Sequence, residues 1–233
     1  MKRRLVWLIP LLLLMSLVWL RSYNPPLVEG VRLRVFDEVQ RLFPAQWEDT
    51  DVRIIDIDDD SLARIGQWPW PRTIVADMVN RLVDAGAAAV AFDVVFAEPD
   101  RTSPAMVIPL WGNNAEFNRM AERLPDHDSV LAGTFARGRV VVGFPLSDVP
   151  TPNARAPIIR AGFATLGDAT SVDPRPYLMP FVGVTPNIAA FDVAAAGQGN
   201  FTTGFERDGI VRRVPLISVF NRPGAPSMLV PSL

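Results

Sequence analysis

The chain contains no cysteine, one histidine (His127) and one lysine (Lys2) among its 233 residues. Without cysteine, the chain can form no disulfide bond, no thiolate nucleophile and no cysteine-based zinc site. A single imidazole likewise excludes any metal site that needs two histidine ligands. Because Lys2 lies at the extreme N-terminus, the body of the chain also lacks the lysine that a phosphate-binding P-loop requires.

An excess of charge of one sign is missing too, since 23 Lys and Arg residues oppose 25 Asp and Glu residues. A near-neutral chain without a basic block lacks the electrostatic footprint of nucleic-acid binding, so nucleic acid is not an expected partner. The 49% apolar and 21% charged residues exclude both a disordered tail and a wholly membrane-embedded protein. The length allows one ordinary domain with a core, plus a short additional segment.

Sixteen uncharged residues, Leu5 to Leu20, lie between the basic tip 1–4 and Arg21. A cleaved signal peptide and a retained anchor both begin this way. Cleavage needs small residues in an A-x-A-like pattern, and residues 18–23 offer none, so we favour the anchor. Its sixteen residues reach about 24 Å, short of a typical hydrocarbon core of roughly 30 Å. We predict a transmembrane signal anchor at 5–22, with aromatic rings near both ends.

The positive-inside rule then places residues 1–4 in the cytoplasm and residues 27–233 outside the bacterial inner membrane, in the periplasm or at the cell exterior. Without the three basic residues of the tip, the exported part is net negative. The membrane is therefore an expected partner of the chain.

The segment Leu27 to Phe43 follows a Pro25-Pro26 break and is expected to be helical. Its valines and leucines recur at intervals of three and four residues, which gives one apolar stripe. This stripe could pair with a second copy of the chain in a homodimer, or lie on the chain's own sheet.

A βαβ unit is expected next, with a strand at 51–58, a helix at 73–85 and a second strand at 87–96. Such a unit has parallel strands and a right-handed crossover. Further helices are expected at 115–124, 128–137 and 187–196. A third strand is expected at 139–144, and residues 145–186 form a long surface excursion with one or two short strands.

A hairpin is expected from residues 199–205 and 210–220, joined by a turn that contains Asp208-Gly209. Residues 226–230 look like the start of a helix, so we expect the polypeptide to continue in a longer parent protein. The fold class is therefore α/β: a mixed, mainly parallel sheet with flanking helices and a C-terminal β-hairpin, preceded by one N-terminal transmembrane helix.

Acidic side chains follow both strands of the predicted βαβ unit. Asp56 and Asp58 end the first strand, Asp93 lies within the second, and Glu98 and Asp100 follow it. Because the carboxyl ends of parallel strands share one edge, these groups could hold a divalent cation or a cationic ligand there. The simpler interpretation, which we favour, is that the acidic residues Asp58 to Asp60 cap helices, with Asp59 or Asp60 before the helix expected at 61–65, and that Glu98 to Asp100 forms a turn.

More specific assignments of the polar residues, to a calcium-binding loop, a phosphatase motif or a catalytic triad, do not fit the sequence. An EF-hand starting at Asp56 needs glycine and glutamate where the chain has Ser61 and Gln67. A phosphatase-type D-x-D-x-T motif needs threonine at Asp60. His127 lies in a polar string without a nucleophile-elbow sequence, so we interpret it as a solvated or helix-capping residue.

The rigid aromatic loop Trp68 to Arg72 precedes the predicted helix at 73–85. Trp68 and Trp70 could stack on a ligand or pack against the sheet, and packing is the simpler reading because indole buries a large area.

The run from Val52 to Asp100 resembles the CHASE2 sensor domain. It carries a strand ending in I-D-x-x-S-L, a G-x-W-P-W-P-R loop, a helix ending in A-G-A, and F-D-x-x-F-x-E-P-D. A second match is the R-D-G-x-V-R-R-V-P-L element within 199–216. The positions that match the motif and are candidate ligand-binding residues are Asp58, Trp68, Trp70, Arg72, Asp93, Glu98 and Asp100.

The resemblance implies an extracytoplasmic sensor, without catalysis or a cofactor of its own. It would detect an unidentified small-molecule or environmental stimulus and relay it to a cytoplasmic nucleotide cyclase or kinase outside this chain. The rival hypothesis is a metal-dependent hydrolase that uses Asp58, Asp93, Glu98 and Asp100.

Overall fold

A computed structural model describes residues 2–23, 25–46, 48–112, 115–152, 154–164, 173–204, 208–222 and 224–233. The chain divides into two compact units, Met1–Ile57 and Asp58–Leu233. Apart from Leu33, the buried apolar side chains of the described residues belong to the second unit.

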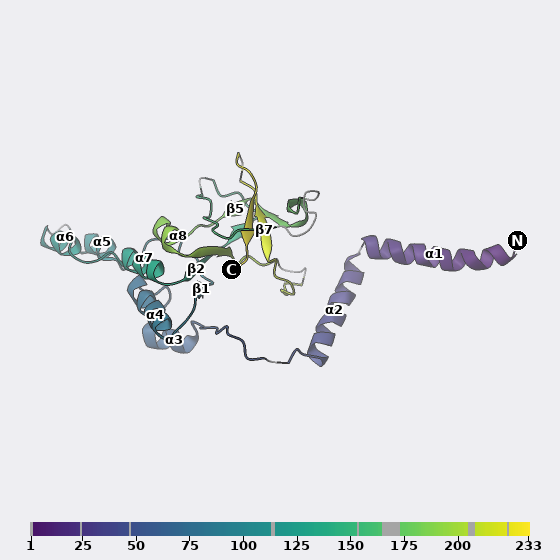
Figure 1. Ribbon diagram of the computed structural model, residues 1–233, viewed down its shortest axis with the longest axis horizontal. Helices are drawn as coiled ribbons and strands as arrows, with labels where there is room; N and C mark the ends of the chain where they lie inside the picture. The colour runs from purple at the N-terminus through teal and green to yellow at the C-terminus, as the bar shows by residue number, and fades with distance from the viewer. Residues whose placement is uncertain are drawn as a thin grey trace. The chain divides into compact units, whose positions relative to one another are not determined.

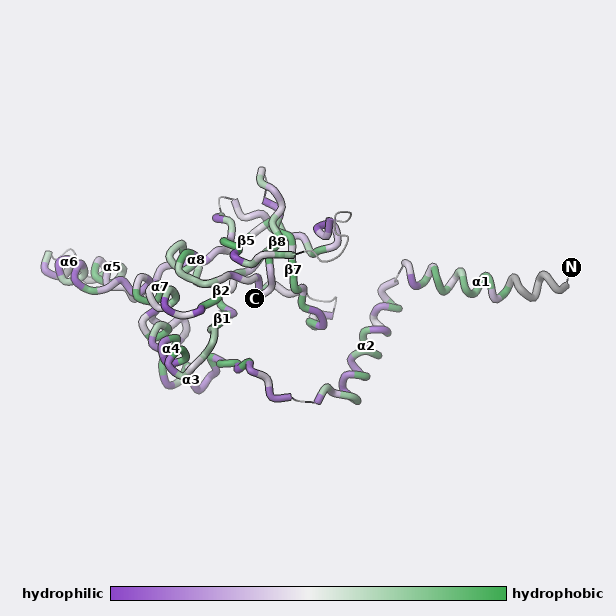
Figure 2. The backbone as a smooth tube through the Cα atoms, viewed as in Figure 1, coloured by the Kyte–Doolittle hydropathy of each residue, from purple (hydrophilic) through white to green (hydrophobic). Residues whose placement is uncertain are grey.

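The first unit contains two helices, α1 (Lys2–Tyr23) and α2 (Pro26–Leu42). α2 begins at Pro26 because proline suits the first turn, where its missing N–H has no helical partner. Figure 2 shows apolar and polar residues alternating along α2. No single helix among the described residues is both long and apolar enough to cross a membrane. Ile9–Tyr23 and Pro26–Leu42 together have sufficient length and apolar composition, as a pair of helices with a bend between them.

The strand predicted at 51–58 is wrong, because residues 51–57 form no strand and Asp58 caps a helix. Val52 and Ile54 are 72% and 92% exposed. A β-rich run becomes a strand only where a neighbouring strand takes up its backbone hydrogen bonds, and these residues have no such partner in the structure. The predicted βαβ unit therefore lacks its first strand.

The second unit begins with α3 (Asp59–Ile65) and α4 (Arg72–Asp84), and its first sheet has the order β1-β2-β6. The three strands are parallel: β1 (Val90–Phe92), β2 (Val140–Phe144) and β6 (Gly197–Asn200). β1 is shorter than the predicted strand at 87–96, because only these three residues pair with β2. Beyond them, the Phe96 amide donates to Asn187 Oδ1 at 2.7 Å instead of to a strand.

Beside this sheet, α7 (His127–Arg137) packs against both α4 and α8 (Ala189–Ala194) (Figure 1). Phe135 of α7 and Phe191 of α8 form an aromatic cluster with Phe92 of β1 and Phe96 after it, in which the ring centroids of contacting pairs lie 5.3–6.3 Å apart. Burial of such large apolar side chains is the main stabilising term of this half of the unit. α5 (Pro104–Val107), a short 3₁₀ turn η1 (Ile108–Trp111) and α6 (Ala115–Ala121) form the connection between β1 and α7.

Two smaller sheets complete the unit. β3 (Leu146–Ser147) pairs antiparallel with β5 (Gly183–Val184). The other sheet has the order β4-β7-β8, with β4 (Met179–Phe181) following the turn η2 (Arg175–Tyr177). β7 (Ile217–Phe220) is parallel to β4 and antiparallel to β8 (Met228–Pro231). The fold is thus mixed α/β, but its sheets are small and only partly parallel.

The C-terminal hairpin differs from the predicted one. Residues 199 and 200 belong to β6 in the first sheet, and β7 pairs with residues 228–231, which were predicted to start a helix. The expected turn at 206–209 lies partly outside the described residues. Residues 228–231 are apolar and follow Gly224, so they fill the antiparallel edge of β7 rather than coil into a helix.

Candidate functional site

The predicted acidic residues do not form one cluster. Asp56 is exposed in the extended segment before Ile57, and Asp93 and the Glu98 side chain are exposed after β1. Asp58 caps α3, since its Oδ1 accepts from the Ser61 amide at 2.9 Å and the Ser61 hydroxyl at 2.6 Å. These bonds from Ser61 lower the pKa of Asp58. Among the described residues, no group of three or more acidic or histidine side chains is arranged to hold a metal ion.

Arg72 and Asp100 do come together, at the N-terminus of α4. The Arg72 amide donates to Asp100 Oδ2 at 2.7 Å, and the Asp100 amide donates to Asp128 Oδ2 at 2.9 Å. Arg72 Nε lies 3.5 Å from Asp128 Oδ1. These three residues, all less than 10% exposed, form what we call the ion cluster. It joins the starts of α4 and α7 to the loop after β1.

Local sequence explains why Arg72 starts α4. Pro71 is the N-cap of the helix. Proline has no side chain that could accept the first helical N–H groups. Asp100, 28 residues away, supplies the missing acceptor and places a negative charge at the positive end of the helix dipole.

The Arg72 guanidinium is enclosed by aromatic rings. Its central carbon lies 4.6 Å from the Phe96 ring centroid and 6.0 Å from that of Phe191. Nη2 donates to the Glu98 carbonyl at 3.3 Å, so Glu98 contributes its backbone here. A planar, weakly hydrated guanidinium suits such an aromatic and carboxylate environment better than an ammonium group would.

Burial and hydrogen bonding oppose each other at the two carboxylates. Burial raises the pKa of Asp128 above its ordinary value, although the Asp100 amide and Arg72 offset part of this effect. Burial alone would raise the pKa of Asp100 too, but hydrogen bonds from Arg72 and Thr102 outweigh it and hold that pKa below the ordinary value. Burial also lowers the pKa of Arg72.

The geometry within the cluster is not fully satisfied. Arg72 Nε and Asp128 Oδ1 are both buried and, among the described residues, neither has a hydrogen-bond partner. At 3.5 Å they attract each other as charges without forming a hydrogen bond. A buried pair held this loosely retains a cost of desolvation, and a small displacement of α4 or α7 would change its energy.

His127 lies at this cluster, which the sequence reasoning did not predict. Its Nδ1 lies 3.2 Å from Asp100 Oδ2 and 3.2 Å from Thr102 Oγ1, and its side chain is 20% exposed. It is the first residue of α7, whereas Asp126 is the N-cap through bonds from Ser129. The interpretation of His127 as a solvated or helix-capping residue is therefore wrong on both counts, because its ring lies at Asp100 and Asp126 is the N-cap. The signal that could have found the site is the string Pro125 to Asp128 before an apolar helix.

The two tryptophans of the aromatic loop before α4 differ in burial. Trp70 is 5% exposed, its Nε1 donates to the Gly66 carbonyl at 2.6 Å, and its ring meets that of Trp68 edge to face at 5.5 Å. Trp68 is half-buried. The buried Trp70 ring offers no open face to a ligand, while Trp68 keeps part of its surface accessible.

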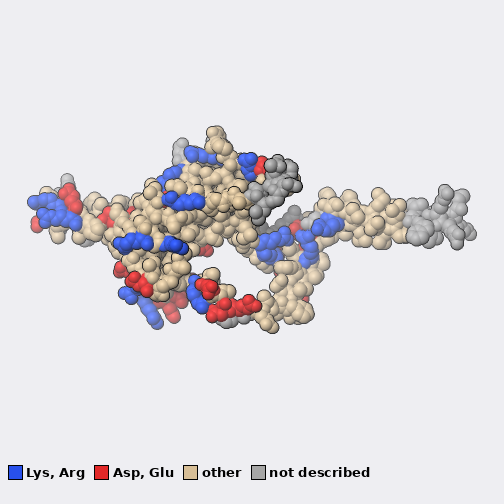
Figure 3. Space-filling model, viewed as in Figure 1, with Lys and Arg blue, Asp and Glu red and all other residues tan. Residues whose placement is uncertain are grey.

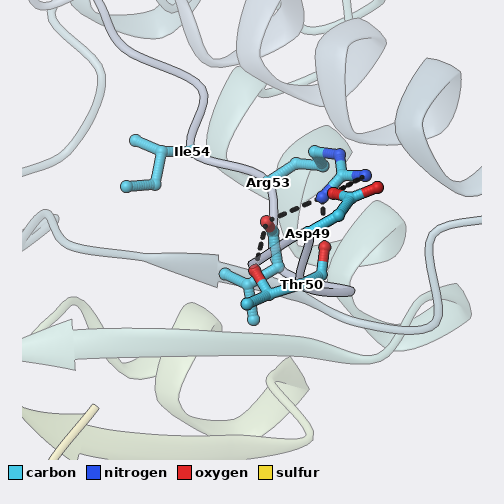
Figure 4. Close-up of a pocket in the computed structure, with 5 residues that line it drawn as sticks. Asp49, Thr50, Arg53 and Ile54 are labelled. Carbon is cyan, nitrogen blue, oxygen red and sulfur yellow. Dashed lines mark hydrogen bonds and ion pairs between the residues drawn. The ribbon is translucent and has the colours of Figure 1, made fainter. Parts of the chain in front are cut away.

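A separate pocket of about 500 Å³, open to solvent, lies in the first unit and is lined by the exposed residues Asp49, Thr50, Val52, Arg53 and Ile54 (Figure 4). Arg53 is paired with Asp49 at 3.0 Å and also donates to the Thr50 carbonyl. The charges of this cavity thus neutralise each other within one short segment. On the face seen in Figure 3, basic and acidic side chains of the second unit are interspersed.

A comparison with protein-family models matches residues 10–233, nearly the whole chain, to the CHASE2 domain. No curated protein and no solved structure matches the chain.

Proposed function

Because the chain belongs to the CHASE2 domain family, we propose that it is the membrane-anchored sensor module of a transmembrane receptor. CHASE2 domains are extracytoplasmic sensor domains, so a sensory and non-catalytic role follows from the family. The family match over residues 10–233 is the observation that carries the proposal. The proposal includes two further statements: the chain is anchored in the membrane, and it relays its signal to a cytoplasmic cyclase or kinase.

Membrane anchoring is supported by the N-terminal sequence. The basic residues Lys2, Arg3 and Arg4 precede the uncharged run Leu5 to Leu20, and α1 is a continuous helix over Lys2–Tyr23. By the positive-inside rule, the tip stays in the cytoplasm and the second unit lies in the periplasm.

Signal relay requires that a stimulus binds two conformations of the domain with different affinities. The ion cluster is a suitable element for such a change, because it joins α4, α7 and the loop after β1 through a buried and incompletely hydrogen-bonded pair. We propose that the relevant conformations differ in the geometry of Arg72 and Asp128. In a homodimer, the apolar stripe of α2 would pair with its twin.

Reporter fusions test the topology. Alkaline phosphatase joined after Leu233 should be active in bacteria, because it folds only outside the cytoplasm, and a green fluorescent protein at the same site should stay dark. Replacing Lys2, Arg3 and Arg4 by glutamate should lower the phosphatase activity and raise the fluorescence, because the positive charges that hold the tip in the cytoplasm are lost. A dark phosphatase fusion and a bright fluorescent fusion of the native chain would contradict the proposal.

A further inference from the structure

A second cavity, of about 360 Å³, lies within the Asp58–Leu233 unit beside the two small sheets. Its walls come from the loop after β3, from the β4–β5 connection and from the end of β7. The lining residues are Pro150, Thr151, Pro152, Ala154, Val182, Val184, Phe220 and Arg222. This volume lies at the lower end of the roughly 300–1,000 Å³ of small-molecule sites, so the cavity suits a compact ligand.

The floor of the cavity is part of the core. Val184 and Phe220 are 1% and 4% exposed, and both belong to the apolar cluster that includes Phe144, Phe181 and Val230. The Asn221 amide donates to the Phe181 carbonyl at 2.8 Å, which fixes the end of β7 against β4. An apolar ligand would therefore meet a rigid surface, and little ordering would be needed on binding.

The loop that forms the opposite wall is held in place. A Cβ atom at Gly183 would overlap the Val149 carbonyl, so the loop approaches β5 as closely as only glycine allows. The Ser147 hydroxyl donates to the same Val149 carbonyl at 2.8 Å. Pro150 and Pro152 restrict the backbone of the loop further. The start of the loop is thus held against β5.

Arg222 is the only charged residue among the eight that line the cavity. Its side chain is exposed, and within the described part of the chain it forms no ion pair or side-chain hydrogen bond. An apolar cavity with one unpaired cation at its rim is complementary to a molecule with an apolar body and a single negative charge.

We propose that this cavity binds a small monocarboxylate with an aliphatic or aromatic body. The body lies against Val184 and Phe220, and the carboxylate pairs with Arg222. This site is separate from the ion cluster, and binding there does not depend on the proposed relay across the membrane.

The test uses the full chain in lipid nanodiscs, with empty nanodiscs as the blank. Phenylacetate and hexanoate are titrated by calorimetry and by saturation-transfer NMR, each beside its uncharged amide. At least one acid should bind, and its amide should bind about tenfold more weakly because the charge-assisted hydrogen bond is lost. Arg222→Gln should weaken the acid to the same extent and leave the affinity of the amide unchanged.

Two further variants complete the experiment. Arg81→Gln, an exposed change on α4, should leave the affinity for the acid unchanged. Thr151→Trp, an exposed change at the rim, should block the cavity and abolish binding of acid and amide alike. Thermal unfolding of each variant checks that it is folded, and Arg222→Gln decides the result should Thr151→Trp fail to fold.

Three outcomes would each overturn the proposal: absence of binding by both acids, equal affinity of acid and amide, or unchanged affinity for the acid in Arg222→Gln. Because none of these readouts uses an output domain, a failed topology test would leave the result standing.

Discussion

Arg72 shows how one residue can serve several elements at once. Its amide starts α4 on Asp100, its guanidinium lies over Phe96, and its charge faces Asp128. Breaking a buried ion pair costs more than the pair itself contributes, because the remaining charge has lost its partner and stays out of water.

Removal of the Arg72 guanidinium should therefore destabilise the chain strongly. We expect Arg72→Met to lower the free energy of unfolding by about 3–5 kcal/mol, since Asp128 remains buried without a counter-charge. Arg72→Lys should recover part of the loss, because it restores the charge but not the planar fork. Denaturant titration followed by circular dichroism measures both. Arg81→Met, at an exposed position of the same helix, is the control and should change stability by less than about 0.5 kcal/mol. Equal losses at the two positions would contradict a special role for Arg72.

The pH dependence of stability should reveal Asp100. Its pKa in the folded chain lies below the ordinary value of 3.8. Its ionised form therefore stabilises the folded state above that value, and this contribution is lost as the pH falls through the folded pKa. Between about pH 5 and pH 3, the thermal midpoint of Asp100→Asn should fall less than that of the native chain.

Asp128 should act in the opposite direction. Its raised pKa means that protonation on acidification relieves a cost of the folded state. Asp128→Asn removes this relief, so its midpoint should fall more steeply than that of the native chain over the same pH range. Asp77→Asn, at an exposed position of α4, should leave the native profile unchanged. Parallel profiles for all four proteins would contradict the assignment.

At the scale of elements, α2 carries an apolar stripe that no described residue of its own unit covers. Val31, Val35, Val39 and Leu42 are 48–63% exposed. Successive residues are rotated by about 100° around a helix, so these four positions share one face. Ion pairs between Glu29 and Arg32 and between Glu38 and Arg41 lie along the rest of the helix. Such a stripe is typical of a helix that pairs with another helix.

Because the native chain has no cysteine, a single introduced cysteine reports this pairing directly. Val35→Cys in membranes should form a disulfide-linked dimer under mild oxidation, since a parallel twin places the two sulfur atoms within bonding distance. Arg34→Cys points about 100° away from the stripe and should cross-link much less. Non-reducing gel electrophoresis measures both variants. Equal cross-linking of the two would exclude a dimer through the apolar stripe.

On the scale of the whole molecule, the division of the chain at Ile57 has a consequence for folding. The aromatic cluster, the ion cluster and the second cavity all lie within residues 58–233. A domain that contains its own core can fold without its neighbours. We therefore expect a fragment of residues 58–233 to unfold cooperatively on heating, with the ion-cluster variants shifting its midpoint as they do in the full chain. A fragment without a cooperative transition would show that residues 1–57 contribute to the core.

The sequence alone was sufficient for features that depend on local physics. The apolar periods at 27–43, 73–85 and 128–137 predicted α2, α4 and α7 close to their observed bounds, because each helix satisfies its own backbone hydrogen bonds. The motifs around Trp68 to Asp100 were likewise enough for the CHASE2 family. Strand pairing could not be predicted from the sequence, since a strand exists only where another strand accepts its hydrogen bonds. Residues 51–57 remain unpaired and residues 228–231 became β8 for that reason. Tertiary structure also brought His127 and Asp128 to Asp100 from 27 and 28 residues away, because the folding of α7 onto α4 is a long-range contact that no local pattern encodes.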